Sequence, residues 1–314
     1  MAKQITNNIL MIRPVAFRMN EQTAVNNYYQ KAIDGLTIEQ IQSNALQEFD
    51  SYVDKLKAIG VNVIVINDKI EPSTPDSIFP NNWVSFHESG KVGLYPMFAK
   101  NRRLERRQDI LDLLVSDGFK ISKVTDLTGL ENDDIFLEGT GSLILDRENQ
   151  IVYAAISERT HISALEQFCV LFNYKSIVFH SNQTVAGKRV PIYHTNVMMC
   201  VAKDFAIICA DSIDDINERA NTLNALEESG KELILISEEQ VSRFAGNMLQ
   251  VLGANSQEYL IMSSAAYTCL SQDQIGQIKK YCPIVHSSLD TIEALGGGSA
   301  RCMMAEVFLP RDSN

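Results

Sequence analysis

Three residues of the chain combine a reactive side chain with a polar or glycine-rich loop beside it. Cys302 follows Gly296-Gly-Gly298, and glycines let a backbone approach a ligand closely. His194 lies between a polar loop and an apolar segment, and its imidazole can accept and return a proton near neutral pH. Glu138 precedes Gly139-Thr-Gly141, and a carboxylate there can orient a histidine or bind the N–H groups of a planar ligand. Together these side chains favour covalent catalysis by a cysteine nucleophile.

Each of these residues also has an ordinary structural interpretation. Taken alone, Cys302 would be a buried core cysteine, His194 a structural histidine and Glu138 a turn carboxylate. A zinc site made of the three side chains is an alternative, but the sequence has no short ligand spacing to support it. The glycine-rich segments lack the lysine of a phosphate-binding loop, so we expect no bound nucleotide. Covalent catalysis by a cysteine requires no metal or organic cofactor, and we expect none.

The reactive residues occupy a position that recurs along the chain. Helical periodicity appears in five segments, and a short apolar strand follows each of them. The helical segments are 37–59, 102–117, 161–173, 213–229 and 271–281. Pairs of strands joined by turn residues lie between these units, with one polar or reactive residue at the entrance of each pair. These marked residues are Asn82, Glu138, His194, Asn247 and Cys302, separated by 56, 56, 53 and 55 residues.

Five units of hairpin, helix and strand predict a closed, pseudo-symmetric α/β ring whose marked residues face a common axis. The last hairpin needs a partner strand after Phe308, where few residues remain. The strand predicted at 9–17 has no helix before it, so we expect it to complete the ring. An open α/β sheet with ordinary loops is the alternative. Because no linker divides the chain, we predict a single catalytic domain, 1–314.

The composition narrows the choice of partners. With 45% hydrophobic and 21% charged residues the chain is an ordinary globular protein. A net charge of -11 argues against nucleic acids and anionic membranes, which are bound largely through Lys and Arg. The six cysteines have no CxxC spacing, which indicates reduced thiols in a cytoplasmic protein. The apolar stretches are too short for a signal peptide or membrane helix, so we expect a soluble protein with a small-molecule substrate, possible as a homo-oligomer.

The order and spacing of several motifs resemble those of the guanidino-group-modifying enzymes. The motifs are Ile12-Arg-Pro14, Phe79-Pro-Asn-Asn-Trp83, Glu138-Gly-Thr-Gly-Ser142, Ser157-Glu-Arg-Thr160, Tyr193-His-Thr-Asn196 and Gly297-Gly-Ser-Ala-Arg-Cys302. That superfamily includes arginine deiminases, dimethylarginine dimethylaminohydrolases, amidinotransferases and a citrulline-hydrolysing branch. The resemblance covers nearly the whole chain and implies a five-bladed α/β propeller of ββαβ units, called a pentein, in agreement with the repeat.

The resemblance also implies roles for individual residues. Cys302 matches the family nucleophile, His194 the general acid–base and Glu138 the carboxylate beside it. Arg159 resembles the arginine that binds the substrate α-carboxylate in the dimethylarginine hydrolases. In the implied mechanism the Cys302 thiolate attacks the sp² carbon, His194 as imidazolium protonates the departing amine, and as imidazole it then activates water.

Substrate-binding residues are expected from the same motifs. Phe79 and Asn82 belong to one of them and Asn196 to another, while Arg103 or its neighbour Arg102 matches a second substrate arginine. We assign that role to Arg103.

The two asparagines depart from the arginine deiminases, which have aspartates at those positions to hold the guanidinium cation. An asparagine NH₂ instead suits the carbonyl of a neutral ureido group. We therefore expect hydrolysis of citrulline to ornithine, ammonia and carbon dioxide, and the motifs resemble the citrulline ureidase-like branch most closely.

Other functions remain open at this stage. Within the same class, the chain could be a deiminase or dimethylaminohydrolase acting on arginine or its methylated forms, or an amidinotransferase. A non-catalytic binding protein is an alternative from another class, because a ribosome-associated anti-association factor uses the same propeller. That alternative needs neither the nucleophile nor the base.

Overall fold

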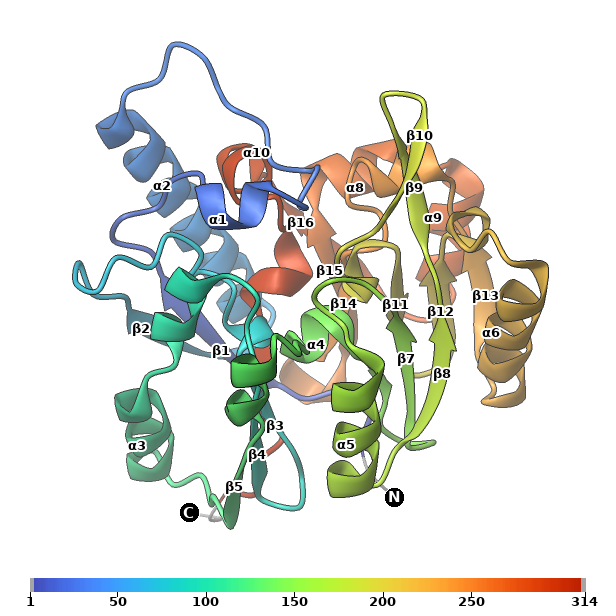
Figure 1. The fold of residues 1–314 in the computed structure, drawn as a ribbon, viewed down its shortest axis with the longest axis horizontal. Helices are drawn as coiled ribbons and strands as arrows, with labels where there is room; N and C mark the ends of the chain where they lie inside the picture. Colours follow the sequence, from blue (N-terminus) through green and yellow to red (C-terminus); the bar gives the residue numbers. More distant parts are fainter. Residues whose placement is uncertain (1–2, 312–314) are drawn as a thin grey trace.

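The computed structural model of the chain describes residues 3–311 and has a mixed α/β fold made of short sheets and surrounding helices (Figure 1). The α-helices are α1 (Glu21–Ala24), α2 (Ile38–Ala58), α3 (Gln108–Ser116), α4 (Gly139–Ser142), α5 (Ile162–Phe172), α6 (Ile216–Glu228), α7 (Glu238–Val241), α8 (Ser264–Cys269), α9 (Gln272–Lys279) and α10 (Asp290–Gly296). The 3-10 helices are η1 (Pro80–Asn82), η2 (Lys100–Glu105), η3 (Thr128–Asp133), η4 (Thr195–Val197), η5 (Ala210–Ser212), η6 (Ala254–Ser256) and η7 (Ala300–Met303).

Strands occupy the segments between these helices. They are β1 (Asn8–Arg13), β2 (Asn62–Asn67), β3 (Val84–Phe86), β4 (Lys91–Leu94), β5 (Lys123–Asp126), β6 (Ile144–Asp146), β7 (Ile151–Ala155), β8 (Lys175–Phe179), β9 (Asn182–Val185), β10 (Lys188–Pro191), β11 (Met199–Val201), β12 (Phe205–Ile208), β13 (Glu232–Leu235), β14 (Leu249–Leu252), β15 (Glu258–Ser263), β16 (Ile284–Ser287) and β17 (Ala305–Glu306).

Five three-stranded sheets repeat one strand order. In each sheet the first two strands are antiparallel and the third joins in parallel. The sheets are β17-β1-β2, β3-β4-β5, β6-β7-β8, β11-β12-β13 and β14-β15-β16. A helical segment connects the two parallel strands of each sheet, as a parallel crossover requires. The predicted unit of hairpin, helix and strand is therefore confirmed, although the units form separate sheets rather than one continuous barrel.

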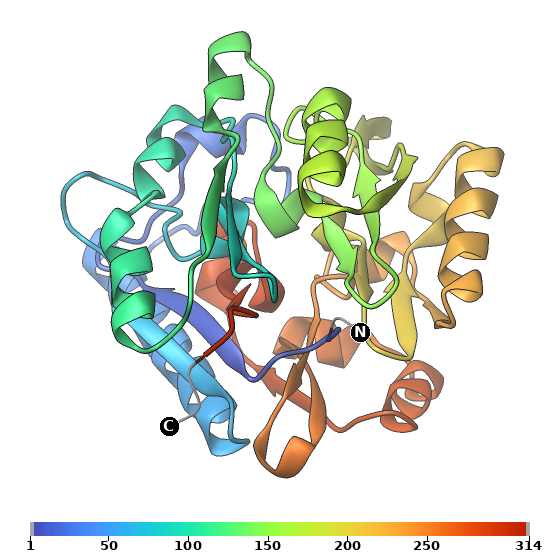
Figure 2. The ribbon, with the colours of Figure 1, turned by 90° about the horizontal axis from the view of Figure 1, so that it is seen from below.

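The two ends of the chain meet in one sheet. β1 pairs in parallel with β2 and antiparallel with β17, where Ile9 faces Glu306 and Leu10 faces Ala305. The predicted pairing of the first strand with the last hairpin is confirmed, and Figure 2 shows these blue and red segments on the same side of the molecule. Residues Ile9 to Ile12 are almost fully buried, which explains why β1 is a continuous apolar run rather than an alternating one.

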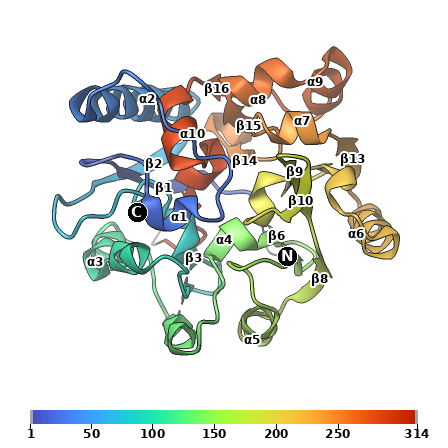
Figure 3. The ribbon, with the colours of Figure 1, turned by 45° about the horizontal axis from the view of Figure 1, so that its top comes forward.

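The helices arrange themselves in two groups. Figure 3 shows α2, α3, α5, α6 and α9 at the outer rim, whereas α1, α4 and α10 lie toward the middle. The apolar face of α2, which includes Phe49, Tyr52 and Leu56, is fully buried, and a capping box between Thr37 and Gln40 starts the helix. The rim helices follow the sequence periodicity, while the central ones are too short to show any.

Two predicted elements differ from the observed ones. The helix expected at 102–117 is broken into η2 and α3, because Arg106 and Arg107 adopt extended backbone angles between them. The strand expected at 120–124 begins at Lys123 instead, where the pairing with β4 sets its register. The break in the helix matters for function, because it places the side chains of η2 independently of α3.

Two further findings concern membrane-spanning helices and disulfide bonds. No helix within residues 3–311 combines the length and apolar character needed to cross a membrane. All six cysteines are free thiols, so no disulfide stabilises the fold.

Candidate active site

The marked residues of the five units come together beside one small cavity in the middle of the molecule. Asn82, Glu138, His194 and Cys302 stand in or next to a short helical turn, Asn247 follows a turn after α7, and all five are buried. The cavity has an empty volume of about 260 Å³. Its lining consists of Thr23, Asn27, Asp76, Phe79, Asn82, Arg102, Arg159, Tyr193, His194, Gly296, Gly298 and Cys302. The common direction of the marked residues, expected from the repeat, is what brings these side chains to one place.

His194 and Glu138 form a directly hydrogen-bonded pair. His194 Nε2 lies 2.8 Å from Glu138 Oε2, and the other carboxylate oxygen accepts the backbone N–H of Phe98 at 2.9 Å. Burial alone would raise the pKa of the Glu138 carboxyl, but the charge of Arg159 and the His194 hydrogen bond hold it well below its usual range. Burial lowers the pKa of His194 to about 4 despite this carboxylate. The pair therefore rests as a carboxylate and a neutral imidazole near neutral pH.

Cys302 is held by two side-chain amides. It lies in η7 with 3% of its surface exposed, and its sulfur accepts hydrogen bonds from Asn196 Nδ2 at 3.3 Å and Asn247 Nδ2 at 3.1 Å. Within residues 3–311 no hydrogen bond joins this sulfur to His194. The nucleophile and the proposed acid–base thus line one cavity but have separate partners.

The glycines before Cys302 allow other side chains of the protein to pack closely against the backbone there. A Cβ at Gly296 or Gly298 would lie 2.7 Å or 3.0 Å from the ring of Phe79. Gly297 has a φ of +62° and contacts Asn27 closely. The close approach expected of these glycines is therefore made to Phe79 and Asn27, which themselves line the cavity.

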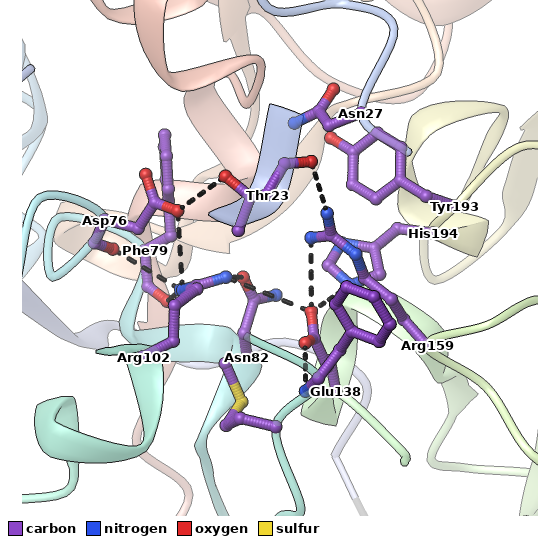
Figure 4. A network of polar contacts seen from close by, with 12 residues as sticks. Thr23, Asn27, Asp76, Phe79, Asn82, Arg102, Glu138, Arg159, Tyr193 and His194 are labelled. Carbon is purple, nitrogen blue, oxygen red and sulfur yellow. Dashed lines mark hydrogen bonds and ion pairs between the residues drawn. The ribbon is translucent and has the colours of Figure 1, made fainter. Parts of the chain in front are cut away.

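Two buried arginines border the cavity, as Figure 4 shows. Arg159 lies 3.5 Å from Glu138 and stacks on the Tyr193 ring, with 4.8 Å between the guanidinium carbon and the ring centroid. Arg102 donates to Asn82 Oδ1 at 2.8 Å and pairs with Glu105, also at 2.8 Å. Both guanidinium groups are thus fixed by carboxylates and by neutral acceptors.

Arg102, rather than the expected Arg103, is the second arginine that lines the cavity. Arg103 donates to the carbonyl of Met97 and pairs with Glu131 at 3.4 Å, away from the cavity. Two neighbouring residues of a 3-10 turn point in different directions, and the turn η2 was interpreted as part of a regular helix. The ambiguity between the two arginines was visible in the sequence, but its resolution required the fold.

Asn82 has only donor atoms left to offer a ligand. Its Oδ1 accepts from Arg102, and because a guanidinium has no acceptor, this fixes the orientation of the amide. Its Nδ2 is buried and has no partner among the residues that the structure describes. Gly141 makes room for this group, since a Cβ there would lie 2.4 Å from Asn82 Nδ2 and 2.9 Å from the His194 ring.

Two other residues in this region, Asp76 and Asn196, each have a buried acceptor atom without a partner in the described range. Asp76 Oδ2 accepts from Asn20 Nδ2 at 2.8 Å and from the Thr23 hydroxyl at 3.1 Å, while its Oδ1 is buried and unpaired within the described range. Asn196 Oδ1, next to the sulfur of Cys302, is likewise unpaired there. Asp76 was not predicted, and nothing in its sequence neighbourhood distinguishes it from a loop carboxylate.

The segment around α1 covers the cavity. Arg159 donates to the carbonyl of Thr23 at 3.0 Å and, from Nε, to Asn26 Oδ1 at 3.0 Å. Asn27 donates to the carbonyl of Gly296 at 3.4 Å. The sequence does not distinguish these residues, because α1 is a single turn without apolar periodicity.

Metal ligation has little support in this arrangement. Residues 3–311 contain no group of three or more His, Cys, Asp or Glu side chains placed to hold a metal ion. Glu138 and His194 bind each other, and Cys302 binds amides instead.

Comparison with known proteins gives the family. A family model described as N,N dimethylarginine dimethylhydrolase, eukaryotic, matches residues 13–309, nearly the whole chain. No curated protein gives a significant match. Among solved structures, apo ArgZ, an arginine dihydrolase from the ornithine-ammonia cycle in cyanobacteria, is similar with a TM-score of 0.73 at 18% identity. The match covers 97% of this chain and 41% of the ArgZ chain, so the chain spans about two fifths of that protein's length.

Two other solved structures are matched over their whole length. The product-bound N-terminal domain of ArgZ has a TM-score of 0.72 and 18% identity, with 98% of this chain and 100% of that chain covered. A DDAH from Pseudomonas aeruginosa, a cysteine-to-serine mutant complexed with citrulline, has a TM-score of 0.63 and 14% identity, with 97% and 100% covered. At sequence identities this low, similarity between structures shows only that the fold is shared. The family model, in contrast, matches the amino-acid sequence of the chain. The chain therefore belongs to the N,N-dimethylarginine dimethylhydrolase family of the guanidino-modifying superfamily.

Proposed function

We propose that this chain hydrolyses the ureido group of citrulline to ornithine, ammonia and carbon dioxide, with Cys302 as nucleophile. The observation that carries this proposal is the state of Asn82. Its acceptor is used by Arg102, so only its NH₂ group faces a ligand. A ureido carbonyl is an acceptor and complements that group, whereas a guanidinium has donors only and would leave two donors facing each other.

The charges around the cavity also support a neutral reacting group. Arg102 and Arg159 are balanced by the carboxylates of Glu138 and Asp76. Both oxygens of Glu105 accept from Arg102, at 2.8 Å and 2.9 Å, so this arginine is already paired with its own carboxylate. Citrulline is a zwitterion with a neutral side chain and adds no net charge to this balance. Arginine would bring an additional buried cation, which is costly without a dedicated anion.

The amino-acid end of the substrate has candidate partners in the same cavity. Arg159 suits the α-carboxylate, as the family resemblance implies, and Arg102 borders the same space. The unpaired Oδ1 of Asp76 suits an α-ammonium group. Asn196 Oδ1, beside the sulfur, suits a ureido N–H. The unpaired atoms of Asn82, Asp76 and Asn196 thus correspond to the groups of one ureido amino acid.

The reaction can proceed with the residues present. Cys302 attacks the ureido carbon, and the proton of its thiol passes to the neutral imidazole of His194. Asn82 Nδ2 donates to the oxygen that becomes negative. The imidazolium, stabilised by Glu138, protonates the departing amine, and a thiocarbamate remains on the sulfur. A water molecule gives its proton to His194 and attacks this intermediate, the C–S bond breaks, and the sulfur takes the proton back from His194. The released carbamate loses carbon dioxide and leaves the second amine, so that one water is used per citrulline and ornithine and ammonia are both formed.

Hydrolysis of dimethylarginine is the second candidate, because the matching family model carries that description. It would require the guanidinium to be bound beside the amides of Asn82 and Asn196. Arginine itself is a third possibility of the same kind, since ArgZ is an arginine dihydrolase.

A product assay tests these alternatives. The purified protein is incubated separately with citrulline, arginine and dimethylarginine, ammonia is measured, and the amino-acid products are identified by chromatography. We expect ornithine from citrulline and no product from a Cys302→Ser variant. Citrulline formed from arginine or dimethylarginine, with no turnover of citrulline, would refute the substrate proposal, and full activity in Cys302→Ser would refute the mechanism.

We further propose that the five sheets are the blades of one closed five-bladed propeller that makes up a single domain, and that the protein acts in the cytoplasm. The shared strand order of the sheets and the convergence of their marked residues support the first point. The six free cysteines support the second.

A further inference from the structure

Asn247 contacts Cys302 and its loop through both ends of one amide group. Its Oδ1 accepts the backbone N–H of Arg301 at 3.0 Å and that of Cys302 at 3.4 Å. Its Nδ2 donates to the Cys302 sulfur at 3.1 Å and to the Asn196 carbonyl at 3.0 Å. Because two N–H donors face Oδ1, the NH₂ group must be the one that faces the sulfur. One buried side chain therefore fixes both the backbone and the sulfur of the nucleophile.

Among residues 3–311, no cationic side chain donates a hydrogen bond to the sulfur. The guanidinium of Arg301 donates to the Met304 carbonyl at 2.9 Å and to Glu306 at 3.0 Å, on the side away from the cavity. Burial lowers the pKa of His194 to about 4, so its ring is neutral near neutral pH. Within the described part of the chain, the sulfur's hydrogen-bond donors are amides.

The other titratable groups near the sulfur are two tyrosines, which also remain neutral. Burial raises the pKa of Tyr52 and of Tyr193 well above the usual range. Tyr52 donates to the Ala300 carbonyl and Tyr193 to the Gly297 carbonyl, so both hold the same loop. The charged groups that line the cavity are Arg102, Arg159 and Asp76, with the carboxylate of Glu138 behind His194. On α10, Glu293 accepts from Ser299 at 2.6 Å in the loop before Cys302, and burial raises the pKa of Glu293 to about 7.

We propose that Asn247 is a positioning residue that stabilises the thiolate form of Cys302, with Asn196 as the second donor. The two amides take the role that a neighbouring cation plays for many reactive cysteines, since hydrogen bonds to the charged form favour it. The proposal rests on the proposed role of Cys302 as nucleophile but not on the identity of the substrate.

The test is the pH dependence of Cys302 alkylation in an Asn247→Asp variant. This change is nearly isosteric and keeps an oxygen for the two backbone N–H groups, while it replaces the donor to the sulfur with a carboxylate oxygen. Iodoacetamide modification is followed by mass spectrometry of the tryptic peptide 302–311, in which Cys302 is the only cysteine. Asn221→Asp, an exposed position on α6, is the matched control for the added charge.

We expect the alkylation rate near neutral pH to fall about tenfold or more in Asn247→Asp, because a hydrogen bond to a charged group contributes about 1.5 kcal/mol or more. The midpoint of the pH profile should rise, and the control should match the wild type. Circular dichroism and thermal melting establish that the variants fold. Asn247→Ala removes the donor without adding a charge and should shift the midpoint in the same direction, which separates the loss of the donor from the effect of the new carboxylate.

A folded variant whose profile coincides with that of the wild type would overturn the proposal, because a purely structural role leaves the titration of the sulfur unchanged. The result of the alkylation experiment does not depend on whether the proposed substrate is correct. If the wild type turns over no citrulline but the alkylation profile shifts as expected, the substrate proposal fails and the role of Asn247 stands.

Discussion

Replacing Asn82 with aspartate should change the ligand preference of the site from citrulline to arginine. In Asn82→Asp the oxygen that accepts from Arg102 is kept, and the unpaired Nδ2 becomes an oxygen. The atom that faces the ligand therefore changes from a donor to a charged acceptor. A ureido carbonyl loses its partner, while a guanidinium gains a charge-assisted one.

The magnitude follows from the two hydrogen bonds concerned. Loss of a hydrogen bond between neutral groups costs about 0.5–1.5 kcal/mol, and a bond to a charged group contributes about 1.5–3 kcal/mol. The ratio of the two dissociation constants should therefore change by about 2–4.5 kcal/mol, or about thirtyfold to two-thousandfold in favour of arginine. The burial cost of the new carboxylate is limited because Arg102 remains beside it at a distance suited to an ion pair.

Binding can be measured without turnover in a Cys302→Ser background. Isothermal titration gives the dissociation constants of citrulline and arginine with and without Asn82→Asp, and Asn82→Ala serves as the second arm. The alanine variant should lose affinity for citrulline without gaining affinity for arginine. A ratio that stays within about threefold of the parent in a folded Asn82→Asp protein would refute the reasoning, since that difference lies below the weakest effect expected.

Two further predictions concern the space available at a buried glycine and the protonation of a buried carboxyl group. Gly141→Ala would place a Cβ 2.4 Å from Asn82 Nδ2 and 2.9 Å from the His194 ring, so ammonia release should fall about a hundredfold. Gly276→Ala, on α9 with no atom within 4 Å, should keep the activity and melt at a slightly higher temperature; equal activities would contradict the steric argument. Burial raises the pKa of Glu293 to about 7, so the contribution of its protonated form to stability is complete below the unfolded pKa of 4.5 and is lost as the pH rises through 7. The free energy of unfolding of Glu293→Gln minus that of the wild type, measured with urea, should therefore rise by about 1–3 kcal/mol from acid to alkaline pH. A difference that is the same at both pH values would exclude this titration.

The sequence carried enough information to predict the repeating unit. The rim helices have long apolar faces, such as that of α2, and their periodicity survives in the linear sequence. The marked residues recur at nearly constant separation, which is why their convergence could be expected before any coordinates were known. The first strand was correctly paired with the last hairpin because the count of strands left only that partner.

The segment around α1 that covers the cavity, and the choice of the second arginine in the site, could not be predicted in the same way. Residues 20–30 form one short turn with polar side chains, and their contacts with Arg159 and Gly296 span more than a hundred residues of sequence. The choice between Arg102 and Arg103 depends on the direction of a 3-10 turn. Local patterns do not encode such directions, because tertiary contacts decide them.

The sequence by itself determined the chemical types in the site and their place in each unit: a thiol, an imidazole, a carboxylate and several amides. Only the tertiary structure decided which atom of each side chain remains free. Asn82 is a donor toward the ligand because Arg102 occupies its oxygen, and Asn247 is a donor toward Cys302 because backbone N–H groups occupy its oxygen. An amide has both a donor and an acceptor, so its function depends on the neighbour that uses the other end, and folding alone supplies that neighbour.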